Sequence, residues 1–105
     1  MLVKMGVDVS SAKDPIRRAR KKVDDVFKKH GEPEAVLTST NGGNHRTDSF
    51  HYVNLADDYR GPMVHPEKFD DIVKDIRAVL GSDYDVIAHK NVGRFGYLHV
   101  EYDPK

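Results

Sequence analysis

The spacing of apolar residues along the chain predicts two amphipathic helices. The first begins at Asp14-Pro15, a pair suited to an N-cap and a first helical position, and Gly31 is a natural stop. Its apolar stripe is formed by Ile16, Ala19, Val23, Val26 and Phe27. The second helix extends from about Pro66 to Leu80, and Gly81 ends it. Its stripe contains Phe69, Ile72, Val73, Ile76, Val79 and Leu80.

The remaining apolar runs predict strands. An alternation over residues 3–9 indicates a short N-terminal strand, and Ala35–Thr40 is a second. A His- and Asp-rich stretch then leads to Arg60, and Tyr84–Lys90 and Phe95–Tyr102 form a hairpin around the turn at 91–94. The resulting order, β-α-β-loop-β-α-β-β, predicts a small α+β fold. We expect one domain over residues 1–105, with a mainly antiparallel sheet flanked by two helices.

Composition narrows the class of protein. The 105 residues fit one domain, and 17 basic against 17 acidic residues give no net charge that would attract a polyanion. No run approaches the roughly 18 apolar residues of a membrane-spanning helix, so we expect no membrane partner. Cysteine is absent, which excludes disulfides and thiolate zinc sites. The N-terminus does not have the pattern of a signal peptide, so we expect synthesis in the cytoplasm.

Histidine is the unusual component, with six in the chain. His45 and His51 fall in the central polar stretch, His99 is on the last predicted strand, and Asp58 follows His51 by seven residues. Two histidines and a carboxylate are a common catalytic zinc set. Seven residues of helix span about 10 Å, so His51 and Asp58 can share a metal only if the chain turns near Asn54. The alternative is that a polar surface loop collects histidines without binding a metal.

The last predicted strand has two different faces. His99 and Glu101 alternate onto one face, and Leu98, Val100 and Tyr102 point to the other. One face therefore belongs to the core, and the other is a polar surface or a site.

Two segments carry a family resemblance. Residues 49–58, SFHYVNLADD, resemble the SxHxxGxAxD signature of the zinc D-alanyl-D-alanine carboxypeptidases, the VanY-like peptidases of the hedgehog/DD-peptidase fold. Ser49, His51, Ala56 and Asp58 match that signature in spacing. Residues 98–102 are similar to the closing strand of this family, which ends in an HxE-type segment and supplies the third metal ligand.

This resemblance implies a small phage-type zinc peptidase. It implies that His51, Asp58 and His99 bind Zn²⁺ and that Ser49 contacts the substrate. The metal would activate a water and polarise the scissile carbonyl of a bacterial cell-wall (peptidoglycan) peptide. A short chain of this kind is compatible with a phage or prophage product that acts at the cell wall.

The chain departs from the family at the general base. Many members carry an acidic residue three positions before the last histidine ligand, where this chain has Gly96. His89, on the neighbouring strand of the hairpin, is the first substitute because histidine titrates near neutral pH. Glu101 is the second, since it shares a face with His99. Either residue could instead hold a ligand imidazole in place.

The family also often has an arginine after the strand at residues 38–39 that binds a substrate carboxylate. This chain has Thr40–Gly43 there, so Arg46 and Arg60 are the candidates to replace it. His45 is a loop residue or a substrate contact.

Two other classes of function compete. The first is a non-catalytic, metal-containing structural or peptide-binding relative, such as a phage virion module, which Gly96 favours. The second is nucleic-acid binding by the basic run at residues 17–22. Asp24, Asp25 and the neutral total weaken the second class, so we expect a solvated helix face and no nucleic-acid partner.

Overall fold

The computed structural model describes residues 1–7, 14–40 and 55–104. The elements are β1 (Leu2–Val3), α1 (Asp14–Lys29), β2 (Val36–Thr40), β3 (Leu55–Arg60), the 3-10 helix η1 (Pro66–Lys68), α2 (Phe69–Leu80), β4 (Tyr84–His89) and β5 (Tyr97–Tyr102). The predicted α+β class and the predicted element order are confirmed.

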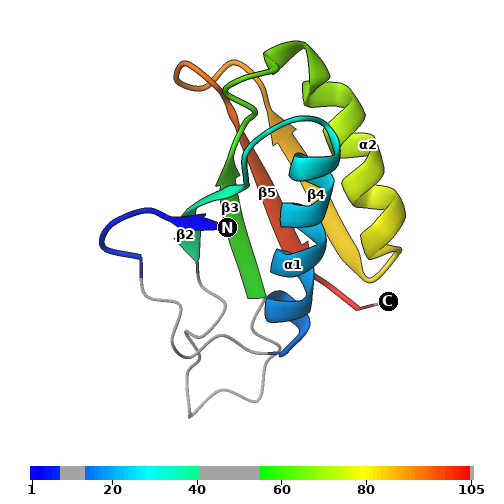
Figure 1. The fold of residues 1–105 in the computed structure, drawn as a ribbon. Coiled ribbons are helices and arrows are strands. Elements are labelled where there is room, and N and C mark those ends of the chain that lie inside the picture. Colours follow the sequence, from blue (N-terminus) through cyan, green and yellow to red (C-terminus); the bar gives the residue numbers. More distant parts are fainter. Residues whose placement is uncertain (8–13, 41–54, 105) are drawn as a thin grey trace.

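One five-stranded sheet organises the chain, with strand order β1-β2-β3-β5-β4. The β1–β2 pair is parallel and the other three pairs are antiparallel. Both helices lie on the same side of the sheet (Figure 1). Among the described elements no helix covers the opposite face, so the sheet has one core face and one open face.

The core lies between the helices and the sheet. The stripes of α1 and α2 pack against inward-facing side chains of β2, β3 and β5. The fully buried members include Val23, Phe27, Leu37, Ile72, Ile76, Leu98 and Val100. None of the helices in the described residues combines the length and apolarity that crossing a bilayer requires.

Two sequence predictions about this core are corrected. Val79, expected in the stripe of α2, is 45% exposed and lies beside the groove between the helices. The N-terminal strand stops at Val3 rather than continuing toward Val9, and Met5 is almost fully exposed. The chain turns at Gly6, whose φ of +90° favours glycine. Val9 itself lies outside the described residues.

Two glycines join the end of β3 to the start of β5. The Gly61 N–H donates to the Gly96 carbonyl at 3.0 Å. A Cβ on Gly61 would lie 2.0 Å from the Phe95 carbonyl oxygen, so no larger residue fits without moving the backbone. This close approach supports the register that places Asp58 opposite His99.

Candidate functional site

On the open face of the sheet, nine side chains of β3, β5 and β4 form three rows. Neighbouring residues across antiparallel strands share a face, so the pairing of β3, β5 and β4 defines each row. The rows are Arg60–Tyr97–His89, Asp58–His99–Ile87 and Ala56–Glu101–Asp85. We call these nine residues the open face.

The middle row contains a short polar contact between β3 and β5. His99 Nδ1 lies 2.8 Å from Asp58 Oδ1, and His99 Nε2 lies 3.2 Å from Glu101 Oε1. Burial lowers the pKa of His99, but hydrogen bonds to Asp58 and Glu101 outweigh burial and raise this pKa above its usual value. The two carboxylates therefore fix both nitrogens of one imidazole.

A hollow of about 150 Å³ opens beside this pair. Its lining comes from the ends of β2 and β3 and from His99 on β5. The lining residues are Ser39, Thr40, Ala56, Asp57, Asp58 and His99. The Asp58–His99 pair thus lies in the wall of a cavity large enough for a few atoms of a ligand.

His89 lies one row away from His99 on the open face. It is opposite Tyr97 in the hairpin, and the two rings stack with centroids 4.4 Å apart and planes 14° apart. His89 and His99 are diagonal neighbours, a relationship that separates residues by about 7–8 Å. The hairpin prediction correctly placed His89 on the strand beside His99, at a distance that suits contact through a water or a ligand.

Four predicted site residues lie outside the described residues. They are His45, Arg46, Ser49 and His51, and Asn54 of the expected turn lies outside as well. The third metal ligand and the substrate contacts assigned to this segment therefore stay predictions.

Gly96, where related peptidases often have an acid, has a backbone that disfavours any side chain. Its φ is +69°, and a Cβ there would lie 2.6 Å from the His89 carbonyl oxygen and 3.1 Å from the Phe69 ring. An acid at this position would strain the turn between β4 and β5. The backbone path of this chain therefore excludes an acidic side chain at this position.

Sequence reasoning missed a buried ion pair beneath the site. Arg20 donates to both carboxylate oxygens of Asp57, at 2.7 and 3.0 Å, and to Thr40 Oγ1 at 2.8 Å. The Tyr59 hydroxyl donates to the same carboxylate at 3.2 Å. Burial lowers the pKa of Arg20, but Asp57 outweighs burial and raises it. Arg20 falls on the apolar stripe of α1, between Ile16 and Val23. This helical spacing was the signal in the sequence that could have predicted its burial.

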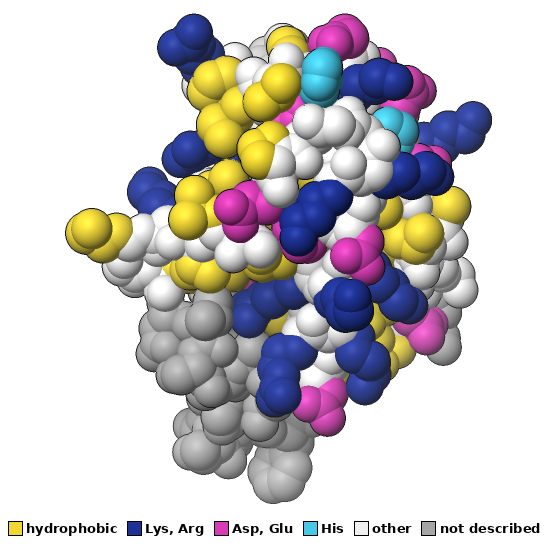
Figure 2. Space-filling view, in the orientation of Figure 1, with side chains coloured by type: hydrophobic (Ala, Val, Ile, Leu, Met, Phe, Trp, Pro, Cys, Tyr) yellow, Lys and Arg dark blue, Asp and Glu magenta, His cyan; other side chains and the backbone are white. Residues whose placement is uncertain are grey.

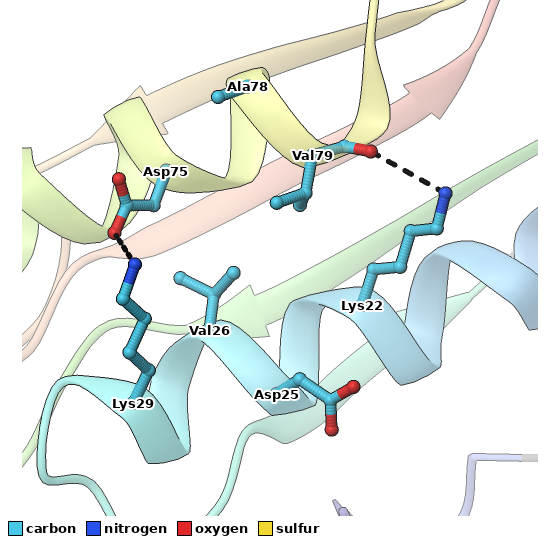
Figure 3. Close-up of a pocket in the computed structure, with 7 residues that line it drawn as sticks. All are labelled: Lys22, Asp25, Val26, Lys29, Asp75, Ala78 and Val79. Atoms are coloured by element: carbon cyan, nitrogen blue, oxygen red, sulfur yellow. Dashed lines mark hydrogen bonds and ion pairs between the residues drawn. The ribbon is translucent and has the colours of Figure 1, made fainter.

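Arg20 belongs to the basic run at residues 17–22 of α1, but its side chain is buried and is not part of the exposed basic surface. The remaining Lys and Arg side chains gather over α1, with Asp and Glu side chains among them (Figure 2). In the groove between α1 and α2, Lys29 pairs with Asp75 at 3.4 Å and Lys22 donates to the Val79 carbonyl at 3.5 Å (Figure 3). These contacts fit the expected solvated helix face.

Comparison of the chain with models of known protein families, with curated proteins and with solved structures found no match.

Proposed function

We propose that this chain is a zinc-dependent peptidase that cuts peptides of the bacterial cell wall, with Asp58 and His99 as two of its metal ligands. The observation that carries the proposal is the 2.8 Å approach of Asp58 Oδ1 to His99 Nδ1 in the wall of a hollow. His51, implied as the third ligand by the resemblance, lies outside the described residues.

The donor chemistry of this pair fits zinc. A carboxylate oxygen and an imidazole nitrogen are common zinc ligands, with bonds of about 2.0–2.2 Å. Two such donors at a tetrahedral centre lie about 3.3 Å apart, so the Asp58–His99 pair would open by about 0.5 Å. Zinc held there would supply an activated water and a polarised scissile carbonyl.

Glu101 fits the role of positioning His99. Metal-bound histidines commonly donate their second ring N–H to a carboxylate, which fixes the tautomer and the ring orientation. The 3.2 Å contact between His99 Nε2 and Glu101 leaves Nδ1 directed at Asp58. Of the two roles that the sequence left open for Glu101, this geometry favours holding the imidazole over proton transfer.

His89 is the proposed proton carrier. It shares the open face with His99 and is one row removed from it. Its imidazole would take a proton from the attacking water and deliver it to the leaving amine, acting first as general base and then as general acid. Stacking on Tyr97 would hold the ring in place for both transfers.

Hydrolysis of a cell-wall peptide tests this function. Purified protein with zinc is incubated with N-acetyl-D-alanyl-D-alanine and with peptidoglycan peptides, and the products are identified by mass spectrometry. We expect cleavage that stops with chelator and in Asp58→Asn but continues in Asp70→Asn, whose side chain is 76% exposed on α2. Zinc binding without cleavage of any wall peptide would contradict the peptidase.

The second candidate is the non-catalytic, metal-containing relative, and the backbone at Gly96 favours it. The steric exclusion of a side chain there removes the position of the usual acid. This candidate retains the Asp58–His99 metal pair and expects peptide binding without hydrolysis. The same incubation separates it from the peptidase.

A further inference from the structure

The outer edge of β4 lies at one end of the sheet. In the part of the chain that the structure describes, β4 pairs with β5 and is the last strand in the sheet order (Figure 1). Its register with β5 is uninterrupted over Tyr84–His89, and the strand contains no proline. Bulges and prolines are common devices that keep a sheet edge from pairing with another chain. This edge therefore has the regular backbone that an added strand requires.

Alternate residues of β4 direct their backbone groups outward. The Asp103 N–H donates to the Asp83 carbonyl at 2.8 Å, so odd-numbered residues face β5 and even-numbered residues face away from it. Val86 agrees with this pattern, because its carbonyl accepts two N–H groups of Arg77 from α2, at 2.8 and 3.2 Å. A side chain thus contacts an acceptor that a neighbouring strand would use. A carbonyl oxygen has two lone pairs, so it can also accept an N–H from an added strand.

A hollow of about 660 Å³ borders this edge. Its lining comes from the end of α2, the first residues of β4 and Glu101 of β5. Ile87, another lining residue, is 48% exposed and offers an apolar contact. Near it, carboxylate oxygens of Asp85, Glu101 and Asp103 lie within 4.8 Å of one another. Their charges outweigh that of the Arg77 guanidinium, so the hollow attracts a cationic side chain.

We propose that the outer edge of β4 binds an extended, basic segment of a partner protein, which pairs with it as an antiparallel strand. Backbone hydrogen bonds to Val86 and Ala88 supply the affinity, as in other complexes in which a peptide extends a sheet. Side chains two residues apart on the segment share a face, so a β-branched residue opposite Ile87 places the second residue along opposite Asp85. A lysine or arginine at that position meets the acidic side of the hollow. This interaction does not depend on the proposed peptidase activity.

A peptide of sequence Thr-Lys-Thr-Val-Thr-Lys-Thr, capped at both ends, tests the proposal. In either direction its valine can lie opposite Ile87 and a lysine opposite Asp85. The peptide is titrated into the isotope-labelled protein, and we expect NMR shift changes centred on the amides of Val86 and Ala88. In this register the N–H groups of the two threonines beside the valine point to β4, and that of the valine points away. N-methylation of both threonines should therefore weaken binding by about tenfold or more, whereas N-methylation of the valine should have little effect.

Charge reversal in the same peptide tests the preference for a basic segment. Glutamate in place of both lysines should weaken binding by about fivefold or more, because like charges then lie opposite each other. Asp85→Asn should weaken binding of the lysine peptide by about two- to fivefold. Asp25→Asn, whose side chain is 60% exposed on α1, is the matched control and should leave binding unchanged. The proposal would be overturned by no binding of the lysine peptide, shift changes away from β4, equal effects of the two N-methylations, or equal affinity for the lysine and glutamate peptides.

Discussion

Arg20 of α1 and Asp57 of β3 form a two-point ion pair inside the protein, and Asp57 is the immediate neighbour of the proposed metal ligand Asp58. The side chain of Asp57 is fully buried and that of Arg20 is 10% exposed. This pair ties the first helix to the strand that carries the site. The strand can therefore point one acid into the core and the next toward the open face.

Loss of this pair should be costly. Asp57→Ala leaves a buried guanidinium without its counter-ion, and we expect it to reduce the free energy of unfolding by about 3–5 kcal/mol. Asp25→Ala, at an exposed pair on α1, should cost less than about 1 kcal/mol. Urea unfolding followed by circular dichroism measures both. Equal stability losses in the two variants would contradict a structural role for the buried pair.

Glu32 should stabilise the segment that connects β3 to α2. Its carboxylate accepts the backbone N–H groups of Met63, Val64 and His65 at 2.8, 3.0 and 2.6 Å. Glu32→Gln keeps the shape but loses the charge, so we expect a loss of about 1.5–3 kcal/mol in denaturant unfolding. Glu67→Gln, whose side chain is 66% exposed, is the control and should change stability by less than about 0.5 kcal/mol.

Asp24 should contribute to the acid sensitivity of the fold. Burial raises its pKa, but Lys28, the Ala35 N–H and the N-terminal ammonium outweigh burial and lower this pKa below 3.8. The stabilisation is therefore present above about pH 4 and is lost as pH falls through the lowered value. In Asp24→Asn, stability should be lower near neutral pH and should fall less steeply below pH 4. Thermal unfolding across this pH range would refute the assignment if both proteins lost stability in parallel.

Glu101 and His89 should affect different properties of the site. If Glu101 holds the ligand imidazole, Glu101→Gln should weaken zinc affinity by about 10- to 100-fold. If His89 transfers protons, His89→Ala should retain zinc and reduce turnover by about 100- to 10,000-fold. Zinc titration and the peptide assay are run on both variants. Full activity in His89→Ala with loss of activity and unchanged zinc affinity in Glu101→Gln would transfer the base role to Glu101.

Local periodicity was sufficient to predict much of this fold. The two helices, the final hairpin and the shared face of His99 and Glu101 follow from spacings of 3.6 and 2 residues. The strand β3 was harder to delimit because Asp57 occupies an inward position that normally holds an apolar residue. Its partner Arg20 is 37 residues away in the sequence, so no local pattern predicts that the two residues form a pair.

The candidate site could be predicted only in part, because it too depends on contacts between residues that are far apart in the sequence. Asp58 and His99 were selected separately by their residue types and by a resemblance. Their direct contact depends on β5 inserting between β3 and β4, a strand order that local periodicity does not specify. The exclusion of a side chain at Gly96 likewise comes from a backbone approach to His89 that appears only in three dimensions.

Zinc stoichiometry on protein purified without a histidine tag tests the central claim most directly. Elemental analysis and zinc titration should give one zinc per wild-type chain, lost in His99→Ala and retained in His65→Ala, whose ring is 42% exposed beside Glu67. Because ligand binding to the native state stabilises it by mass action, chelation should also lower the melting temperature of the wild type. A wild-type chain that binds no zinc, or a His99→Ala variant that binds it as tightly as the wild type, would contradict the account.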